Sequence, residues 1–349
     1  IYFVSSDAWV WGCSVSWGGG GIPTGDGVGI THAPFVSEND PLSVYLHEFS
    51  HDMGLPDLYD YTSPYDPYQF IDGWDLMSMD NAQHHSSWSK MQLGWIPSSE
   101  IVTWTGAATV IATIDRIESP TTGYHTLKIQ LPAWPATFYF LVETRQKIGF
   151  DATGIPANAP DHGVLITMID ETAGNGAGIV REVDQNPATQ TAWDGDAVWQ
   201  VGQCYVDGTY GFAVAILSWT GNGFVIAVGY PQTLTTGVTS GSGSVSPNCP
   251  GPGGCPEVVG SLVTVTATPG GSGWAFSTWT STGGICSPAS TNPCTFTMPN
   301  NPVSVFATFT YTVTFNEVGI ALANTPWGVT VGTTHYPATT PTSSITVSG

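Results

Sequence analysis

Residues 40–60, DPLSVYLHEFSHDMGLPDLYD, constrain the fold more than any other part of the chain. They combine an H-E-x-x-H pattern with helix signals at both ends: Asp40 suits a cap, Pro41 a first helical position and Gly54 the residue just past the end. Apolar residues recur between these ends at three- and four-residue spacing, at Leu42, Tyr45, Leu46, Phe49 and Met53. The pattern therefore predicts one helix that buries this apolar face.

The H-E-x-x-H pattern consists of His47, Glu48 and His51. The two histidines stand one helical turn apart, so both imidazoles can reach one metal ion, with Glu48 beside the ion rather than on it. Zinc lowers the pKa of a bound water from about 15.7 to about 7, and a neighbouring carboxylate can pass the proton to a leaving amine. We therefore predict a zinc site with Glu48 as general base. The alternative is a pair of partly buried helix histidines.

A third metal ligand is expected after the helix, where Gly54 lets the chain reverse. The longer pattern H-E-x-x-H-x-x-G-x-x-H/D places this ligand at Asp57. Asp52 and Asp60 are the competing candidates. Because the motif describes a spatial context as well as a string, we predict Asp57 as the ligand that joins the two histidines.

Several blocks of sequence occur together and in one order along the chain. They are HEFSHDMGLPDLYD (47–60), GWDLMSMD (73–80), WSKMQLGWI (88–96), FYFLVETRQKIGFD (138–151) and HGVLITMID (162–170). In these blocks the chain resembles the immune inhibitor A family of secreted zinc metalloproteases, peptidase family M6, over about residues 1–230. The resemblance implies an α+β metzincin-like catalytic domain that hydrolyses protein or peptide substrates.

The same resemblance makes Met77 the methionine that lies beneath the zinc site, although the residue alone indicates only apolar core. It places the substrate backbone against an edge strand before the helix, with residues 27–35 as the candidate. His32 in this stretch is expected to be structural or near the cleft, and not a ligand. The resemblance also implies that the front of the catalytic domain and any propeptide are missing.

Two further roles near the helix are left open by the sequence. A hydrogen bond to the oxyanion of the reaction could come from Tyr59, Tyr61, His84 or His85, against the alternative of surface or packed side chains. A Ca²⁺ ion could bind between residues 57 and 75, where five aspartates occur, against the alternative of solvated loop acids. These aspartates are Asp57, Asp60, Asp66, Asp72 and Asp75.

Charge restricts the partners of the chain. Acidic residues outnumber basic ones by 27 to 6, for a formal charge of −21. Such a surface repels phosphate backbones and anionic membranes, so we expect no nucleic-acid binding. No run of 18 apolar residues is present, so no membrane span is expected either. Charged residues make up only 9%, against about 25% in an average globular protein. This composition favours a secreted, extracellular protein.

Six cysteines agree with an extracellular location. Proximity in the sequence favours the pairs 249–255 and 286–294 and leaves Cys13 with Cys204, although six cysteines permit fifteen pairings. A second metal site is the rival interpretation of the late cysteines, and Cys13 and Cys204 could also be thiols.

The periodicity changes from helical to alternating at about residue 101, which predicts a multidomain chain. We expect a catalytic domain at 1–100, a β-sandwich at 101–230, a disulfide-bearing β-repeat module at 231–310 and a partial second β module at 311–349. The third part is similar to a small β-repeat module of bacterial surface proteins, with Trp274, Phe276 and Trp279 as its expected core. The last part resembles a β repeat of archaeal extracellular proteins.

Two functions from different classes fit these features. The first is a secreted zinc endopeptidase that uses His47, Glu48, His51 and Asp57. The second is an extracellular surface or filament protein that keeps the protease-like domain as a scaffold. An open edge in an unfinished β module seeks partners, so attachment to a cell surface or self-assembly through the C-terminal modules is a further hypothesis.

Overall fold

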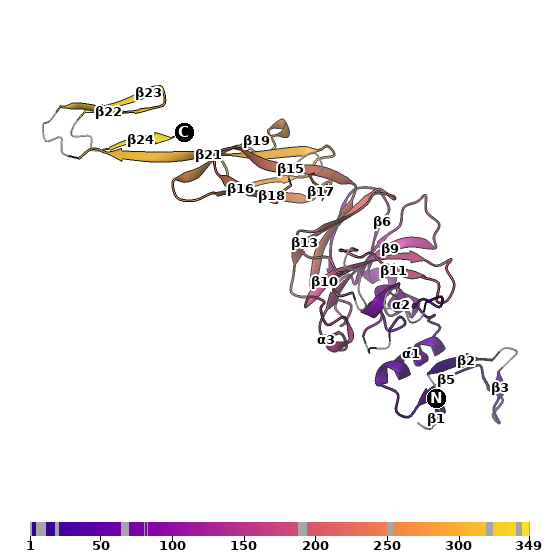
Figure 1. The fold of residues 1–349 in the computed structure, drawn as a ribbon. Helices are drawn as coiled ribbons and strands as arrows, with labels where there is room; N and C mark the ends of the chain where they lie inside the picture. The colour runs from indigo at the N-terminus through magenta and orange to yellow at the C-terminus, as the bar shows by residue number, and fades with distance from the viewer. Residues whose placement is uncertain are drawn as a thin grey trace. The chain divides into compact units, whose positions relative to one another are not determined.

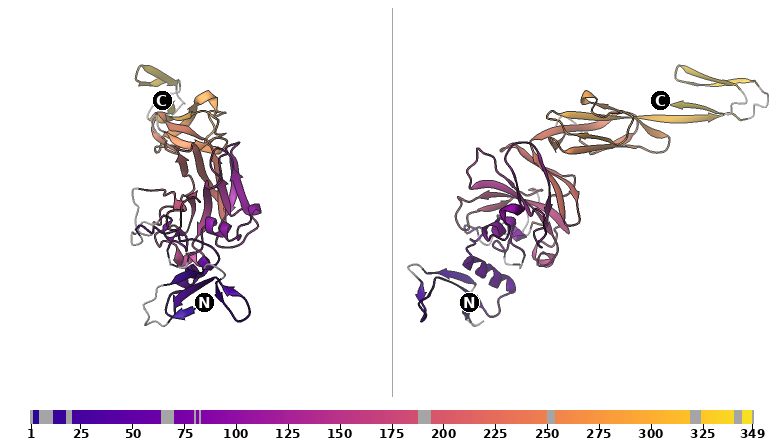
Figure 2. Two further views of the ribbon diagram at one scale, coloured as in Figure 1. Left: turned by 90° about the vertical axis from the view of Figure 1, so that its right-hand side faces the viewer. Right: turned by 180° about the vertical axis from the view of Figure 1, so that it is seen from behind.

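The structure is a computed structural model, and it describes residues 2–4, 12–17, 21–63, 70–79, 81, 83–187, 194–249, 254–318, 324–339 and 344–348. It divides into two compact units, Ile1–Tyr230 and Pro231–Gly349. Strands form most of the regular structure in both (Figures 1 and 2). No helix in the described parts of the chain is long and apolar enough to cross a membrane. The mainly β structure and its division into two units agree with the predicted multidomain chain, while the α+β metzincin-like catalytic domain and the four boundaries stay predictions.

A small sheet opens the first unit, with the strand order β1 (Tyr2–Val4), β5 (His32–Ser37) and β2 (Cys13–Ser16). Strand β1 runs parallel to β5, and β2 runs antiparallel to it. Two short strands, β3 (Ile22–Pro23) and β4 (Gly29–Ile30), form a hairpin. The prediction that residues 27–35 form a substrate-binding edge strand is wrong, because β5 is paired on both sides. Among the described strands of this sheet, β2 is the antiparallel edge.

Helix α1 (Leu42–Asp52) carries the H-E-x-x-H pattern, as predicted. It begins one residue later than expected, with Pro41 as its N-cap, and the Asp40 carboxylate accepts a hydrogen bond from the backbone N–H of Ser37 at 2.6 Å. The prediction of the buried face is wrong. Leu42, Phe49 and Met53 are 57%, 46% and 39% exposed. The buried positions are instead the polar ones, Ser43, His47, Glu48 and Ser50.

The remaining helices of the first unit are short. They are η2 (Asp72–Trp74), α2 (Ser87–Gln92), η3 (Ser98–Glu100) and α3 (Asp151–Gly154). Helix α2 ends at Gln92, and the chain takes a positive φ of 70° soon after it, at Gly94.

Two sheets of mainly antiparallel strands pack against each other in the rest of the first unit. The first has the order β11-β10-β9-β8-β6 and the second the order β12-β13-β14-β7. Their core contains side chains from both sheets, including Phe140, Val142 and Ile166 from the first and Phe212 and Phe224 from the second. The strands are β6 (Ile101–Trp104), β7 (Val110–Asp115), β8 (Thr126–Ile129), β9 (Phe138–Gln146), β10 (His162–Asp170), β11 (Val180–Glu182), β12 (Cys204–Asp207), β13 (Phe212–Trp219) and β14 (Gly223–Gly229).

The first sheet is buried on its other face as well. Alternate residues of β9, Tyr139 and Leu141, point away from the sandwich core and join a second core with Leu58, Trp74 and Met77. The loop after α1 and the segment around Met77 therefore rest on a rigid sheet.

Arg145, on β9 of the first sheet, connects this sheet to η2. Its guanidinium is 1% exposed and pairs with Glu118, Glu143 and Asp151 at 3.2, 3.1 and 2.6 Å. It also donates to the backbone carbonyl of Trp74 at 2.6 Å. Glu143 and Arg145 thus form part of a larger buried ionic cluster.

The second unit is entirely built of strands and one short 3-10 helix, η4 (Thr282–Gly284), in the residues described. One sheet has the order β17-β15-β21-β19 with β24 also on β21, another has the order β16-β18-β20, and β22 pairs with β23. The 14-residue strand β21 runs through position 310. The strands are β15 (Pro231–Ser240), β16 (Gly243–Ser246), β17 (Cys255–Val258), β18 (Leu262–Pro269), β19 (Trp274–Ser281), β20 (Cys294–Thr297), β21 (Val303–Asn316), β22 (Pro326–Val331), β23 (Thr334–Thr339) and β24 (Ser344–Ser348).

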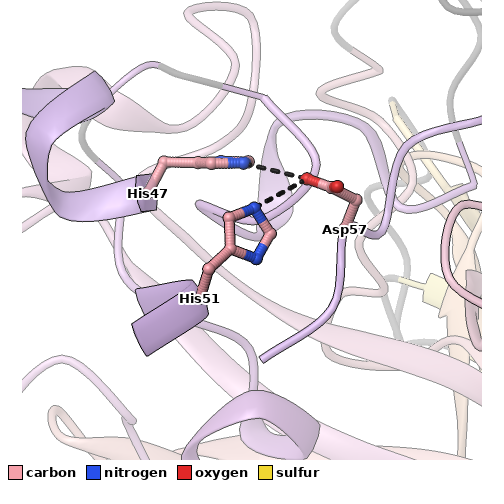
Figure 3. A group of neighbouring side chains, drawn as sticks. All are labelled: His47, His51 and Asp57. Atoms are coloured by element: carbon pink, nitrogen blue, oxygen red, sulfur yellow. Dashed lines mark hydrogen bonds and ion pairs between the residues drawn. The ribbon is translucent and has the colours of Figure 1, made fainter. Parts of the chain in front are cut away.

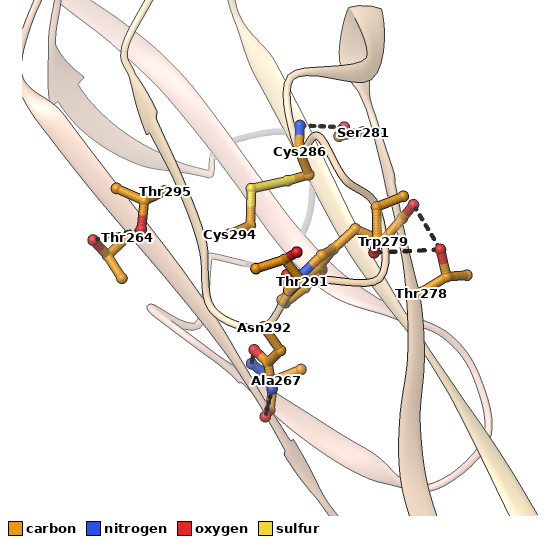
Figure 4. Close-up of a disulfide and its surroundings, with 11 residues drawn as sticks. Thr264, Ala267, Thr278, Trp279, Ser281, Cys286, Thr291, Asn292, Cys294 and Thr295 are labelled. Carbon is orange, nitrogen blue, oxygen red and sulfur yellow. Dashed lines mark hydrogen bonds between the residues drawn. A yellow bond between two sulfur atoms is a disulfide. The ribbon is translucent and has the colours of Figure 1, made fainter.

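Two disulfides join neighbouring strands and loops of this unit, Cys249–Cys255 and Cys286–Cys294, as predicted, and Figure 4 shows the second of them. Beside the second, Trp279 is 4% exposed and its indole N–H donates to the carbonyl of Thr291 at 2.9 Å. The expectation of a 13–204 disulfide is wrong. Cys13 and Cys204 are thiols on strands of different sheets.

Candidate metal centre

The side chains of the three predicted metal ligands lie close together: His47 and His51 on α1, and Asp57 on the loop after it (Figure 3). The Nε2 atoms of His47 and His51 lie 2.9 and 3.2 Å from the same atom, Oδ1 of Asp57. One ligand atom of each residue falls within 4.8 Å of the others, which is the spacing of a single metal site. Asp57 and His47 are each 6% exposed. The structure thus brings the predicted set together in a nearly buried place.

The hydrogen bonds made by Nδ1 of each histidine ring show which ring nitrogen carries the proton. His47 Nδ1 lies 2.9 Å from the carbonyl of Leu76, and His51 Nδ1 lies 2.7 Å from the carbonyl of Leu55. A carbonyl can only accept, so each Nδ1 carries the proton. In a neutral imidazole the Nε2 lone pair then points at a carboxylate oxygen. Acceptors that face one another in this way need either a proton or a metal cation between them. The donor set fits a divalent metal such as zinc.

The charges at the centre depend on one another. Burial opposes ionisation of Asp57, but its contacts with His47 and His51 and the hydrogen bond from Tyr61 outweigh this effect and hold the pKa of its carboxyl well below the usual range. Burial also disfavours the charged form of His51, yet its contacts with Asp57 and the Leu55 carbonyl raise the pKa of the ring. Asp57 is therefore a carboxylate, the form that binds a metal.

The Asp57 loop is held by a second loop, between β10 and β11. At Gly54 the backbone takes a φ of 101°, which ends α1 and turns the chain back. The backbone N–H of Asp57 donates to the side-chain oxygen of Asn175 at 2.6 Å. The Tyr61 hydroxyl donates to Asp57 Oδ2 and receives a bond from Asn175 Nδ2 at 2.8 Å. Asn175 was not anticipated, because only the fold brings it to a loop 118 residues away.

The turn after η2 supports the histidines from the other side. Asp75 is fully buried and accepts hydrogen bonds from the backbone of Met77 and Ser86, at 2.8 and 2.7 Å, and from the Ser89 hydroxyl at 2.7 Å. These bonds fix the turn that presents the Leu76 carbonyl to His47. Met77 is fully buried and its carbonyl accepts from the backbone N–H of Leu58, the residue after Asp57. Its position agrees with a packing role beside the centre.

Glu48 is 6% exposed and lines the same cavity as the three converging residues. The cavity has a volume of about 540 Å³, and β2 forms one wall of it through Cys13, Ser14 and Ser16. Gly12 lies so close to Glu48 that a Cβ there would stand 2.9 Å from Glu48 Oε1. Burial and the charge of Glu48 raise the pKa of the Cys13 thiol, which therefore stays protonated.

The other candidate ligands and oxyanion donors either lie away from this centre or line the cavity beside it. Asp52 accepts from the Ser14 hydroxyl at 3.3 Å, and Asp60 accepts from Thr62 in an exposed turn, so neither joins the group of three. Tyr59 and Tyr61 line the cavity, as does His32. The alternative of packed side chains fits His84 and His85, because His85 bonds Ser50 and Asp75, and His84 packs on Phe150.

The calcium site considered between residues 57 and 75 gains no support. Asp57 belongs to the histidine centre and Asp75 to the turn described above, and Asp66 lies outside the described residues. Asp72 is 1% exposed and faces another part of the fold, near Asp194.

Comparisons with known proteins agree with the geometry. The family model of the immune inhibitor A peptidase M6 catalytic domain matches residues 21–101, which include α1 and Asp57. The family model of a divergent InlB B-repeat domain matches residues 233–313. These matches support a metallopeptidase domain followed by a repeat module. No curated protein matches the chain.

Proposed function

We propose that this protein is a secreted zinc-dependent endopeptidase in which His47, His51 and Asp57 hold the zinc. The observation that carries the proposal is the convergence of two imidazole lone pairs on one buried carboxylate oxygen, beside Glu48 in an open cavity. A zinc ion held there would acidify a water molecule and polarise the scissile carbonyl.

Glu48 is the proposed general base and then acid. It follows His47 directly on α1, so its carboxylate stands next to the ligands without belonging to them. It would take a proton from water onto a carboxylate oxygen and return that proton to the leaving amine. Burial of the side chain keeps the carboxylate in a place of low dielectric, where proton transfer to a bound substrate competes less with bulk water.

The proposed substrate is an extended peptide that pairs with β2. This strand is hydrogen-bonded to β5 on one side and lines the cavity with Cys13 and Ser14. Backbone pairing with an edge strand gives affinity for many sequences, and side-chain pockets then give preference. Tyr61 is assigned a positioning role, because its hydroxyl donates to Asp57.

The location and domain organisation are part of the same proposal. Two disulfides and the match to a B-repeat domain are consistent with an extracellular protein. The predicted parts at 1–100, 101–230, 231–310 and 311–349 are kept as a proposal. The scaffold alternative is not favoured, because a domain without activity has no need of a buried glutamate beside two histidines. Attachment to a cell surface and self-assembly through the C-terminal modules gain no support from these observations.

The variant Glu48→Gln tests the proposal, because it removes the base and no ligand. We expect casein cleavage to fall by at least about 100-fold, the lower range for a lost general base, with zinc content unchanged. Glu38→Gln, which changes an exposed turn residue, is the matched control and should keep full activity. Full activity of Glu48→Gln would contradict the mechanism. Loss of zinc from it would contradict the division between base and ligands.

A further inference from the structure

A second group of acidic side chains lies where β11 ends. One oxygen each from Asp184, Asp194 and Asp196 falls within 4.8 Å of the other two. Glu182, the last residue of β11, lies near enough that the charges of these aspartates and of Asp72 act on its carboxyl. The group is distinct from the histidine centre and contains only oxygen ligands.

Several of these oxygens are buried without a hydrogen-bond donor among the described residues. Asp194 is fully buried, and its Oδ2 has no such partner. The same holds for both carboxylate oxygens of Glu182 and for Oδ2 of Asp184. Leaving a buried polar atom unsatisfied costs about 1–3 kcal/mol, and more for a charged group. Three carboxylates in this condition call for a bound partner.

No basic side chain near the group supplies the missing charge in the described structure. Arg181 is the nearest in sequence, but alternate residues of a strand point to opposite faces. Its guanidinium lies 4.3 Å from the centre of the Phe70 ring and donates to the carbonyl of Ala177. Burial, followed by the neighbouring negative charges, raises the pKa of Glu182 well above its usual value. Burial and contacts with Asp196 raise the pKa of Asp194 to about 7.

We propose that Asp184, Asp194 and Asp196 bind a calcium ion, with Glu182 as a further acidic group beside them. A set of carboxylates without nitrogen or sulfur selects a hard cation. Oxygens on opposite sides of Ca²⁺ stand about 5 Å apart, since each Ca–O distance is about 2.3–2.6 Å, and the observed spacing fits this limit. The many acidic groups and the variable geometry suit calcium better than the strict octahedron of magnesium.

The ion has a structural role that connects it to the histidine centre. The Asp194 carbonyl accepts from the indole N–H of Trp74 at 3.0 Å, and the Asp194 N–H donates to Asp72 Oδ2 at 3.4 Å. Both partners belong to η2, which leads directly to Leu76 and its bond with His47. A bound ion would hold the end of β11, residues 194–196 and η2 together. The proposal stands independently of the peptidase function.

Terbium luminescence on the full chain tests the site directly. Tb³⁺ replaces Ca²⁺ and emits when a nearby tryptophan is excited, and Trp74 is in contact with Asp194. We expect sensitised emission that Ca²⁺ suppresses by competition, with half-saturation by Ca²⁺ no weaker than about 1 mM. The emission should persist in a His47→Ala/His51→Ala variant, which removes the other metal site. Its loss there would show that the ion binds at the histidines and would overturn the proposal.

Substitution separates calcium binding from simple protonation of the carboxyls. The double variant Asp184→Asn/Asp194→Asn should lose the terbium signal and the rise in melting temperature that Ca²⁺ gives the wild type. In a calcium chelator it should melt no lower than the wild type, because the substitution removes like-charge repulsion. Asp26→Asn, an exposed residue of the β3–β4 hairpin, is the control and should keep both signals. Melting of the wild type that Ca²⁺ does not change, with no terbium signal, would mean that neutral carboxyls fill the group and would refute the site. The terbium titration of the wild type decides the matter even if the double variant fails to fold.

Discussion

Replacing Tyr61 by phenylalanine removes one hydroxyl from the contacts that position Asp57. This hydroxyl donates to Asp57 Oδ2 and receives the side-chain N–H of Asn175. A hydrogen bond to a charged group contributes about 1.5–3 kcal/mol. Tyr61 is 47% exposed, so water replaces part of the lost bond and the lower end of the range applies. We therefore expect zinc affinity to fall about tenfold, in line with the usual effect of losing an outer-shell partner.

The assay is a competition titration of zinc against a coloured chelator at pH 7. Tyr59→Phe is the matched control, since the Tyr59 ring lies 5.3 Å from that of Tyr61 and lines the same cavity. The control should bind zinc within about twofold of the wild type, a difference below about 0.5 kcal/mol. Unchanged affinity in Tyr61→Phe, or an equal loss in both variants, would refute the claim that Tyr61 positions the third ligand.

Three further predictions concern stability. Arg145→Leu should destabilise the chain by about 3–5 kcal/mol in chemical denaturation, because it leaves the buried Glu143 and Asp151 carboxylates without this cation. Arg116→Leu, at a more exposed site, should cost less than about 1 kcal/mol. Burial raises the pKa of Glu257 to about 7, so the contribution of this residue to stability should fall as the pH rises from about 4.5 through 7. Calorimetry should show that Glu257→Gln stabilises the folded chain at pH 8, by on the order of 3 kcal/mol at most, and leaves its stability nearly unchanged at pH 4. Replacing Cys286 and Cys294 by serine should cost about 2–3 kcal/mol, the value expected for opening a short loop, and an unchanged melting temperature would contradict this.

The candidate metal centre was predictable from sequence because its parts are close along the chain. A helix fixes the spacing of His47 and His51, and a glycine with φ of 101° turns the next residues back within a few positions. The two disulfides of the second unit were predictable for the same reason, as their cysteines are 6 and 8 residues apart. In each case local geometry decides the contact.

The burial of α1 was predicted wrongly because periodicity alone does not identify the buried face. The helix turns its functional side towards β2 and the Asp57 loop, and this side carries histidine, glutamate and serine. Leu46, Phe49 and Met53 instead line an apolar cavity of about 340 Å³ with Trp95. A functional helix can therefore bury polar groups at the expense of its apolar stripe.

Contacts between residues far apart in the chain could not be predicted from the sequence. Asn175 reaches Asp57, and Arg145 reaches the Trp74 carbonyl, only because the sheet containing β9 and β10 lies under both loops. The absence of a disulfide between Cys13 and Cys204 also follows from the topology, which places the two residues on separate sheets. No pattern within a window of a few residues carries this information.

The metal bound at the histidine centre is the most direct test of the proposed function. Elemental analysis of the purified chain, with X-ray absorption at the zinc edge, would give both the content and the ligand set. We expect one zinc per chain with two imidazole nitrogens and carboxylate oxygen at about 2.0–2.2 Å, and loss of the metal in His51→Ala. A chain that takes up no zinc, or a His51→Ala variant that keeps it in the same coordination, would contradict the assignment of His47, His51 and Asp57.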